Sequence, residues 1–130
     1  MSELVLISHG KMAEGIKDSL ELIMGPQEHI HTVCLLPNEG QELFEKKFNE
    51  VVSSFQSETE ITVFADLMGG TPANTLSKLI MSGKDIHLIA GMNLPMVIKW
   101  VNDQMIGDQS NYVEAAQQGI VDINEMISNM

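Results

Sequence analysis

Short apolar runs alternate along this chain with segments in which hydrophobic residues recur every three or four positions. The runs cover residues 4–7, 30–36, 61–65 and 85–90, and such short, uninterrupted runs are typical of buried parallel strands. The segments that follow them, around residues 11–24, 44–55, 71–82, 94–106 and 110–118, have the spacing of amphipathic helices. Alternating strands and helices predict an α/β fold.

The expected architecture is a doubly wound, mostly parallel four-stranded sheet of strand order 2-1-3-4, with helices on both faces. Glycines at 25, 83 and 107 are predicted to end helices, whereas Thr71 and Asn93 are predicted to cap the helices that follow them. Ile120–Ile123 is predicted to be a short last strand, followed by a weak tail.

The length, charge and composition of the chain exclude several classes of function. A chain of 130 residues fits one domain, 1–130, and no apolar run is long enough to span a bilayer or to resemble a secretory signal, so a cytoplasmic location is expected. The net charge of −11 argues against nucleic acid and anionic membranes as partners. All seven basic residues are lysines. The absence of arginine argues against enzymes that bind phosphorylated small substrates through guanidinium groups, but it argues less strongly against a protein that only carries a phosphoryl group.

The candidate catalytic residues follow the first and third predicted strands. His9 follows the first run and Asp66 follows the third; with strand one between strands two and three, both lie at the crevice where α/β sheets bind ligands. A carboxylate that accepts Nδ1–H orients an imidazole so that Nε2 presents its lone pair. Beside this pair, Gly69, Gly70 and Thr71 open a helix whose free amides favour a phosphoryl group. We therefore predict catalytic roles for His9 and Asp66, phosphoryl binding by the glycine turn, and neither metal nor cofactor.

The remaining histidines are interpreted as structural. His29 and His31 alternate with Ile30 and share one strand face; two histidines can begin a metal site, but solvated edge-strand residues are the favoured interpretation. His87 is expected to be packed or covered in mid-strand.

Cys34 is expected to be a small buried hydrophobic residue. Four methionines, at 12, 68, 92 and 96, cluster at the site turns. About half of them are expected to be ordinary core residues, and the others to form an adaptable apolar rim for protein docking.

Three motifs of this chain resemble the mannose-family IIA component of the bacterial phosphoenolpyruvate-dependent sugar phosphotransferase system, over essentially the whole length. They are residues 6–10 (LISHG), 66–74 (DLMGGTPAN) and 91–96 (GMNLPM). The resemblance implies that His9 accepts a phosphoryl group from the phosphocarrier protein HPr and passes it to a IIB component, with the IIC and IID membrane components involved indirectly. It also implies a homodimer that exchanges its last strand, here Ile120–Ile123. Because the chain stops at Met130, the IIB partner is expected to be a separate polypeptide.

Three rival functions differ in what they require. A receiver-type signalling domain needs an acidic pair after the first strand to hold magnesium, where this chain has Ser8 and His9. The phosphocarrier subunit of the dihydroxyacetone kinase system would use similar chemistry with another acceptor, but residues 69–74 and 91–96 favour the sugar transporter. A non-catalytic flavodoxin-like binding module would gain no acid-labile phosphate.

Overall fold

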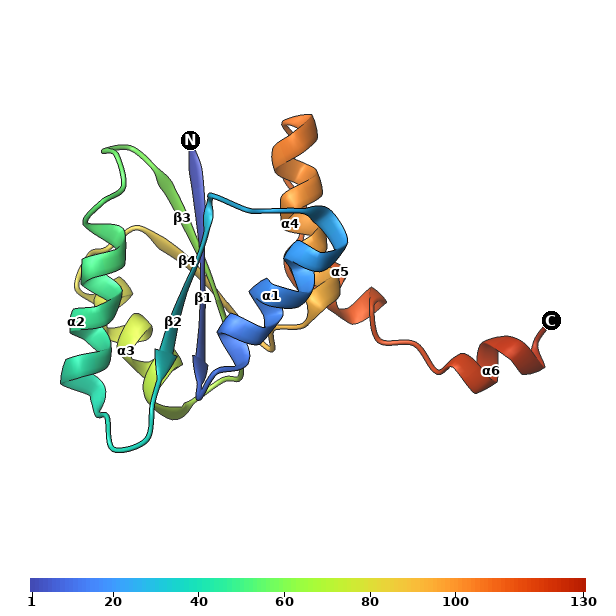
Figure 1. Ribbon diagram of the computed structural model, residues 1–130, viewed down its shortest axis with the longest axis horizontal. Coiled ribbons are helices and arrows are strands. Elements are labelled where there is room, and N and C mark those ends of the chain that lie inside the picture. Colours follow the sequence, from blue (N-terminus) through green and yellow to red (C-terminus); the bar gives the residue numbers. More distant parts are fainter. The chain divides into compact units, whose positions relative to one another are not determined.

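The structure, a computed structural model, describes all 130 residues. The chain forms two compact units, Met1–Met92 and Asn93–Met130. The first unit carries the sheet, and the second is helical (Figure 1). None of the helices is both long enough and apolar enough to cross a membrane.

The first unit contains a four-stranded parallel sheet with the order β2-β1-β3-β4. Its strands are β1 (Ser2–His9), β2 (Ile30–Leu35), β3 (Glu60–Ala65) and β4 (Ile86–Ala90). The predicted order 2-1-3-4 is confirmed, and the central position of β1 explains its sequence, because a strand with neighbours on both sides and helices over both faces has no polar face. Residues 4 to 8 are all fully buried.

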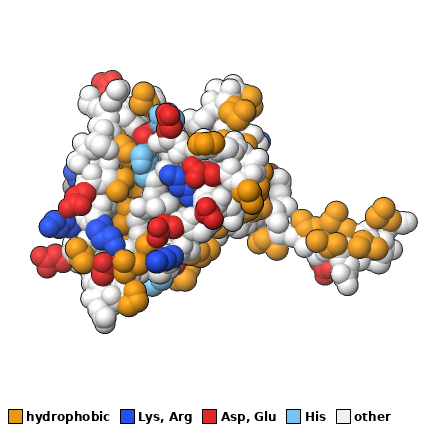
Figure 2. All heavy atoms as spheres, in the orientation of Figure 1, with side chains coloured by type: hydrophobic (Ala, Val, Ile, Leu, Met, Phe, Trp, Pro, Cys, Tyr) orange, Lys and Arg blue, Asp and Glu red, His pale blue; other side chains and the backbone are white.

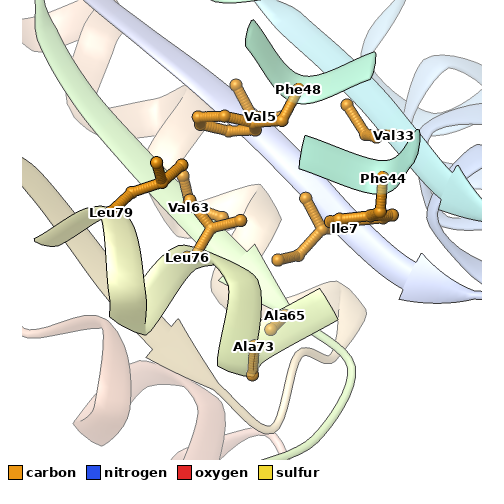
Figure 3. Packing of buried hydrophobic residues seen from close by; sticks show 10 residues of the cluster. All are labelled: Val5, Ile7, Val33, Phe44, Phe48, Val63, Ala65, Ala73, Leu76 and Leu79. Atoms are coloured by element: carbon orange, nitrogen blue, oxygen red, sulfur yellow. The ribbon is translucent and has the colours of Figure 1, made fainter. Parts of the chain in front are cut away.

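Helices cover the two faces of the sheet. Helices α2 (Gln41–Val52) and α3 (Gly70–Met81) pack on the face formed by the odd-numbered residues of β1, and the core there contains the side chains drawn in Figure 3. Successive side chains of a strand point to opposite faces, so Leu4 and Leu6 face the other side, where α1 (Met12–Met24) lies (Figure 1). The aromatic contribution to the first core comes from α2, whose Phe44 and Phe48 are both buried.

The second unit consists of α4 (Leu94–Ile106), α5 (Tyr112–Gln118) and α6 (Ile123–Ser128). Asn93 caps α4 as predicted, because its Oδ1 accepts the Met96 amide at 3.1 Å, and its Nδ2 donates to the Ala116 carbonyl of α5 at 2.9 Å. Gly119 lies against Pro95 so closely that a Cβ atom there would meet the proline ring at 2.4 Å. The start of α4 and the end of α5 are therefore held together.

A buried aspartate organises the turn between α4 and α5. Asp103 is fully buried and accepts hydrogen bonds from the Tyr112 hydroxyl at 2.7 Å and the Ser110 hydroxyl at 3.0 Å. Burial, together with the neighbouring Asp103 carboxylate, raises the pKa of the Tyr112 phenol. Gly107 ends α4 in the left-handed conformation, as predicted, with φ of 68°.

The predicted last strand is wrong for the single chain. Residues 120–122 form neither helix nor strand, and α6 begins at Ile123, with Asp122 as its N-cap accepting the Glu125 amide at 3.1 Å. The pattern Asp-x-x-Glu at 122–125 is a helix-start signal. A short apolar strand needs a neighbouring edge to pair with, and in the single chain the local capping interaction decides the conformation instead.

Candidate functional site

The site is built where β1 leaves the sheet. His9 is the last residue of β1, and Gly10 follows in the left-handed region with φ of 58°, a conformation that favours glycine. The Gly10 amide donates to the Leu35 carbonyl of β2 at 2.7 Å. The turn therefore stays attached to the sheet, while the His9 side chain remains 44% exposed.

Asp66 lies beside His9 because it follows β3, the parallel neighbour of β1. Its Oδ2 accepts two hydrogen bonds from His9, one from the backbone amide at 2.9 Å and one from Nδ1 at 2.8 Å. Its Oδ1 accepts the Leu67 amide at 2.9 Å. The carboxylate is only 7% exposed, and its two oxygens meet three N–H groups.

These hydrogen bonds keep Asp66 ionised. Burial alone raises the pKa of a carboxyl group, but the hydrogen bonds from His9 and Leu67 outweigh it and hold the pKa of Asp66 below its ordinary value. An ionised carboxylate at Nδ1 assigns the proton of a neutral His9 ring to that nitrogen. Nε2 then carries an unshared electron pair and is free to react.

The glycine turn faces the reactive edge of this imidazole. Gly69 and Gly70 have φ values of 84° and 77°, and a Cβ atom at Gly70 would lie 2.7 Å from Cε1 and 2.8 Å from Nε2 of His9. Residue 70 must therefore lack a side chain. The predicted N-cap is wrong: α3 begins at Gly70 with Gly69 as its N-cap, so Thr71 lies inside the first turn.

No side chain caps α3, which leaves its first amides available to an anion. Position 72 is proline and has no N–H group, so the donors of this turn come from the glycines and Thr71. The Thr71 hydroxyl forms no hydrogen bond in the structure, while the Thr71 carbonyl accepts the Thr75 hydroxyl at 2.6 Å. The geometry thus brings His9, Asp66 and Gly70 together, with Gly69 and Thr71 on either side of Gly70 in the turn.

A family model described as the PTS system fructose IIA component matches residues 3–118 of this chain. The chain belongs to this family. The match runs through both compact units and includes every residue of the site described above.

Individual relatives agree with this assignment. The mannose-specific EIIAB component of Escherichia coli K12 is 27% identical over 96 residues, which are 74% of this chain but only 30% of that protein. The sorbose-specific EIIA component of Lacticaseibacillus casei is 28% identical over 97 residues, 75% of this chain and 70% of that one. A crystal structure of an EIIA component from Streptococcus agalactiae is similar with a TM-score of 0.84 at 29% identity, covering 96% of this chain and 99% of the other.

The other histidines of this EIIA family member lie outside the site. His29 and His31 lie at an edge strand as expected, with side chains 56% and 27% exposed. Both also hydrogen-bond the buried carboxylate of Glu3, through Nδ1 of His29 at 2.6 Å and Nε2 of His31 at 2.9 Å. Glu3 is on the central strand, where an unpaired carboxylate would be costly. His87, expected to be covered, is exposed because β4 is an edge strand. No group of three or more histidine, cysteine, aspartate or glutamate side chains is arranged to hold a metal ion.

Two of the four methionines near the site turns are core residues, in agreement with the expectation that about half would be. Met92 and Met96 are buried, whereas Met12 is 43% and Met68 is 87% exposed. Leu67, beside Asp66, is also half exposed. The exposed apolar residues in and next to the turns that follow β1 and β3 are therefore Met12, Leu67 and Met68.

Sequence reasoning missed the contribution of Ser8. Its side chain is fully buried, its Oγ donates to the Gly10 carbonyl at 3.0 Å, and it accepts the Ala13 amide at 2.8 Å. Ser8 thus caps α1 from the strand that precedes it. The sequence feature that could have indicated this cap is a polar residue at the end of an apolar run, directly before the start of a helix.

Cys34 is buried as expected, and burial raises the pKa of its thiol.

We predict that Gly70→Ala disturbs the His9 ring and that Gly69→Ala does not. Both positions have left-handed φ angles, so the two substitutions share the backbone strain, but only a Cβ atom at residue 70 meets the imidazole. In ¹⁵N NMR of histidine-labelled protein, Gly70→Ala should shift both His9 ring nitrogens, and Gly69→Ala should leave them at wild-type positions. Equal ring shifts in the two variants would contradict the steric assignment.

Proposed function

We propose that this chain is a phosphoryl carrier of a sugar phosphotransferase system, with His9 as the residue that is phosphorylated. The observation that carries the proposal is the Asp66 carboxylate at 2.8 Å from Nδ1 of His9, which leaves Nε2 as the free nucleophile. Family membership supports the same function. The chain spans less than a third of the length of the E. coli relatives that it matches, so activity and partners are part of this proposal.

The proposed step moves one phosphoryl group and leaves every proton in place. Nε2 of His9 attacks phosphorus, and an N–P bond forms as the N–P bond of the phosphorylated donor breaks, with the electron pair returning to the donor nitrogen. The product ring keeps its Nδ1 proton and becomes a cation, which the ionised Asp66 stabilises. Transfer to the acceptor is the reverse reaction, with a nucleophile of the acceptor in place of the donor.

The amides and the hydroxyl of the glycine turn are proposed to bind the phosphoryl oxygens. The uncapped start of α3 lies beside Nε2, because a Cβ atom on Gly70 would touch that nitrogen. Preorganised N–H donors stabilise charge that develops on a transferring phosphoryl group. The Thr71 hydroxyl, which has no partner in the structure, is a further donor.

The proposed donor is HPr and the proposed acceptor is a IIB component, with the IIC and IID membrane components involved indirectly. Both partners are proteins, and the exposed Met12, Leu67 and Met68 offer apolar surface at the turns that follow β1 and β3, on which each can dock in turn. We propose a cytoplasmic location, and that residues 1–130 act as one functional domain. Neither metal nor cofactor is part of the step.

The phosphocarrier of the dihydroxyacetone kinase system is the second candidate, because it would use a strand-one histidine in the same way. The relatives are named for mannose, sorbose and fructose systems, which favours a sugar system. A binding module without transfer would not need the ionised carboxylate on Nδ1.

We further propose a homodimer held by the C-terminal segment. Ile120, Val121, Ile123, Met126 and Ile127 are all more than half exposed in the single chain, and Figure 2 shows hydrophobic side chains over most of the α6 segment. Apolar surface of this kind marks an interaction site. We propose that a second copy of this chain covers this surface.

Replacing His9 by Ala should abolish phosphorylation. Intact mass should show one phosphate on the wild type after incubation with phosphoenolpyruvate, the first phosphotransferase enzyme and HPr. That phosphate should be lost in acid and kept in base, because a phosphoramidate is cleaved when its nitrogen is protonated. A single phosphate that persists in His9→Ala, on His29, His31 or His87, would contradict the assignment of the site.

Asp66→Asn should slow phosphoryl transfer by roughly 10² to 10⁴ while the fold is retained. An amide has one oxygen, so it cannot accept from both His9 and Leu67 as the carboxylate does, and it does not stabilise the ring cation. Single-turnover transfer from phosphorylated HPr measures the rate, and circular dichroism checks the fold. Asp85→Asn, an exposed aspartate before β4, is the matched control. Equal rates in the wild type and a folded Asp66→Asn would rule out the proposed pairing.

Truncation after Gly119 should convert the dimer to monomer or aggregate. The deletion removes Ile120 to Met130, all of whose residues are exposed in the single chain, so folding of the rest should be preserved. Light scattering gives the mass, with circular dichroism as the control. A truncated protein that stays a well-folded dimer would remove this segment from the interface.

A further inference from the structure

Lys11 is a free cation two residues from His9. Its side chain is exposed and takes part in none of the ion pairs or side-chain hydrogen bonds of the structure. Lys47, which lines the same groove along β2 as Lys11, is already bound to Glu39 at 2.9 Å and to the Cys34 carbonyl at 2.6 Å. Lys11 is thus the one of the two whose charge is available to a ligand.

Position 11 contradicts the local rules for a helix start. Lys11 is the N-cap of α1 and forms no capping hydrogen bond, although short polar residues are preferred there and a positive charge is unfavourable at that end of a helix. The capping work is done by Ser8, whose Oγ accepts the Ala13 amide. Stability of α1 therefore gives no reason for a lysine at this position, and departures of this kind are expected at functional sites.

A phosphoryl group on His9 would add negative charge beside the ionised Asp66, and a nearby cation would stabilise it. Asp66 is ionised beside the ring. Lys11 lines, with Glu14 and Lys47, a groove of about 460 Å³ along the neighbouring strand β2. A phosphoryl group adds about two further negative charges. The Cα atoms of His9 and Lys11 are at most about 7 Å apart, and the flexible four-carbon stem of lysine carries its ammonium across such a distance.

We propose that the Lys11 ammonium pairs with the phosphoryl group on Nε2 of His9, and that it attracts the phosphorylated donor to a protein whose net charge is −11. This inference rests on the proposed function and assigns one further residue to it. Lys11 takes the part of the guanidinium groups that the chain lacks.

The test compares Lys11→Gln with Lys84→Gln. Both substitutions remove one exposed lysine charge. Lys84, however, precedes β4 and therefore lies at the amino ends of the parallel strands, whereas His9 lies at their carboxyl ends. Transfer from phosphorylated HPr to Lys11→Gln should be roughly 3- to 10-fold slower at low salt. The difference should shrink at 1 M salt, where the screening length falls to about 3 Å. Lys11→Arg should keep most of the wild-type rate, and Lys84→Gln all of it.

A second measurement separates binding of the phosphoryl group from binding of the donor protein. In ³¹P NMR titrations of the phosphorylated proteins, the phosphoryl pKa should be higher in Lys11→Gln than in the wild type and Lys84→Gln, because a nearby cation favours the dianion. An unchanged titration would overturn the proposal, even with a slower rate, since Lys11 would then contact only the donor. If the wild type itself accepts no phosphate, it is the proposed function that fails.

Discussion

The parallel pairing of β1 with β3 is the constraint from which the site follows. In that register Ile7 lies opposite Ala65, and the Asp66 amide donates to the Ile7 carbonyl at 3.1 Å. The residues just beyond the last pair are therefore neighbours, although 57 positions separate His9 from Asp66 in the chain. Because both strands are buried among hydrophobic side chains, a shift of register would expose the core. The packing that stabilises the sheet thus also fixes the distance between the imidazole and the carboxylate.

Asp66 does two things with one carboxylate. The backbone amides of His9 and Leu67 fix its orientation, and the remaining hydrogen bond fixes the proton of the His9 ring. The same hydrogen bonds lower the pKa of the carboxyl group, so the group that stabilises a ring cation is itself charged throughout the neutral range. The protein as a whole is strongly acidic, so the uncapped start of α3 and the exposed Lys11 are the features that would attract an incoming phosphoryl group.

The incorrect and incomplete predictions share one cause, which is that local patterns do not show which partners a side chain finds. His29 and His31 lie at an edge strand as expected, yet the sequence did not show that Glu3, 26 and 28 residues away, binds both. About half of the four methionines near the site turns were expected to be core residues, but the sequence did not show which; Met92 and Met96 are the buried ones. At residues 120–123 the apolar pattern favoured a strand, and the capping aspartate at 122 decided for a helix after it.

The sequence by itself determined the alternation of strands and helices, the two polar residues that end β1 and β3, and the glycine turn that opens α3, because periodicity and strand ends are local properties of a chain. It also pointed to the family through three separated motifs. Only the tertiary structure decided that one carboxylate oxygen accepts both N–H groups of His9, that Gly70 must leave room for the ring, and that Ser8 rather than residue 11 caps α1. Those facts depend on distances of about 3 Å between residues from different elements, and no pattern along a single chain specifies such distances.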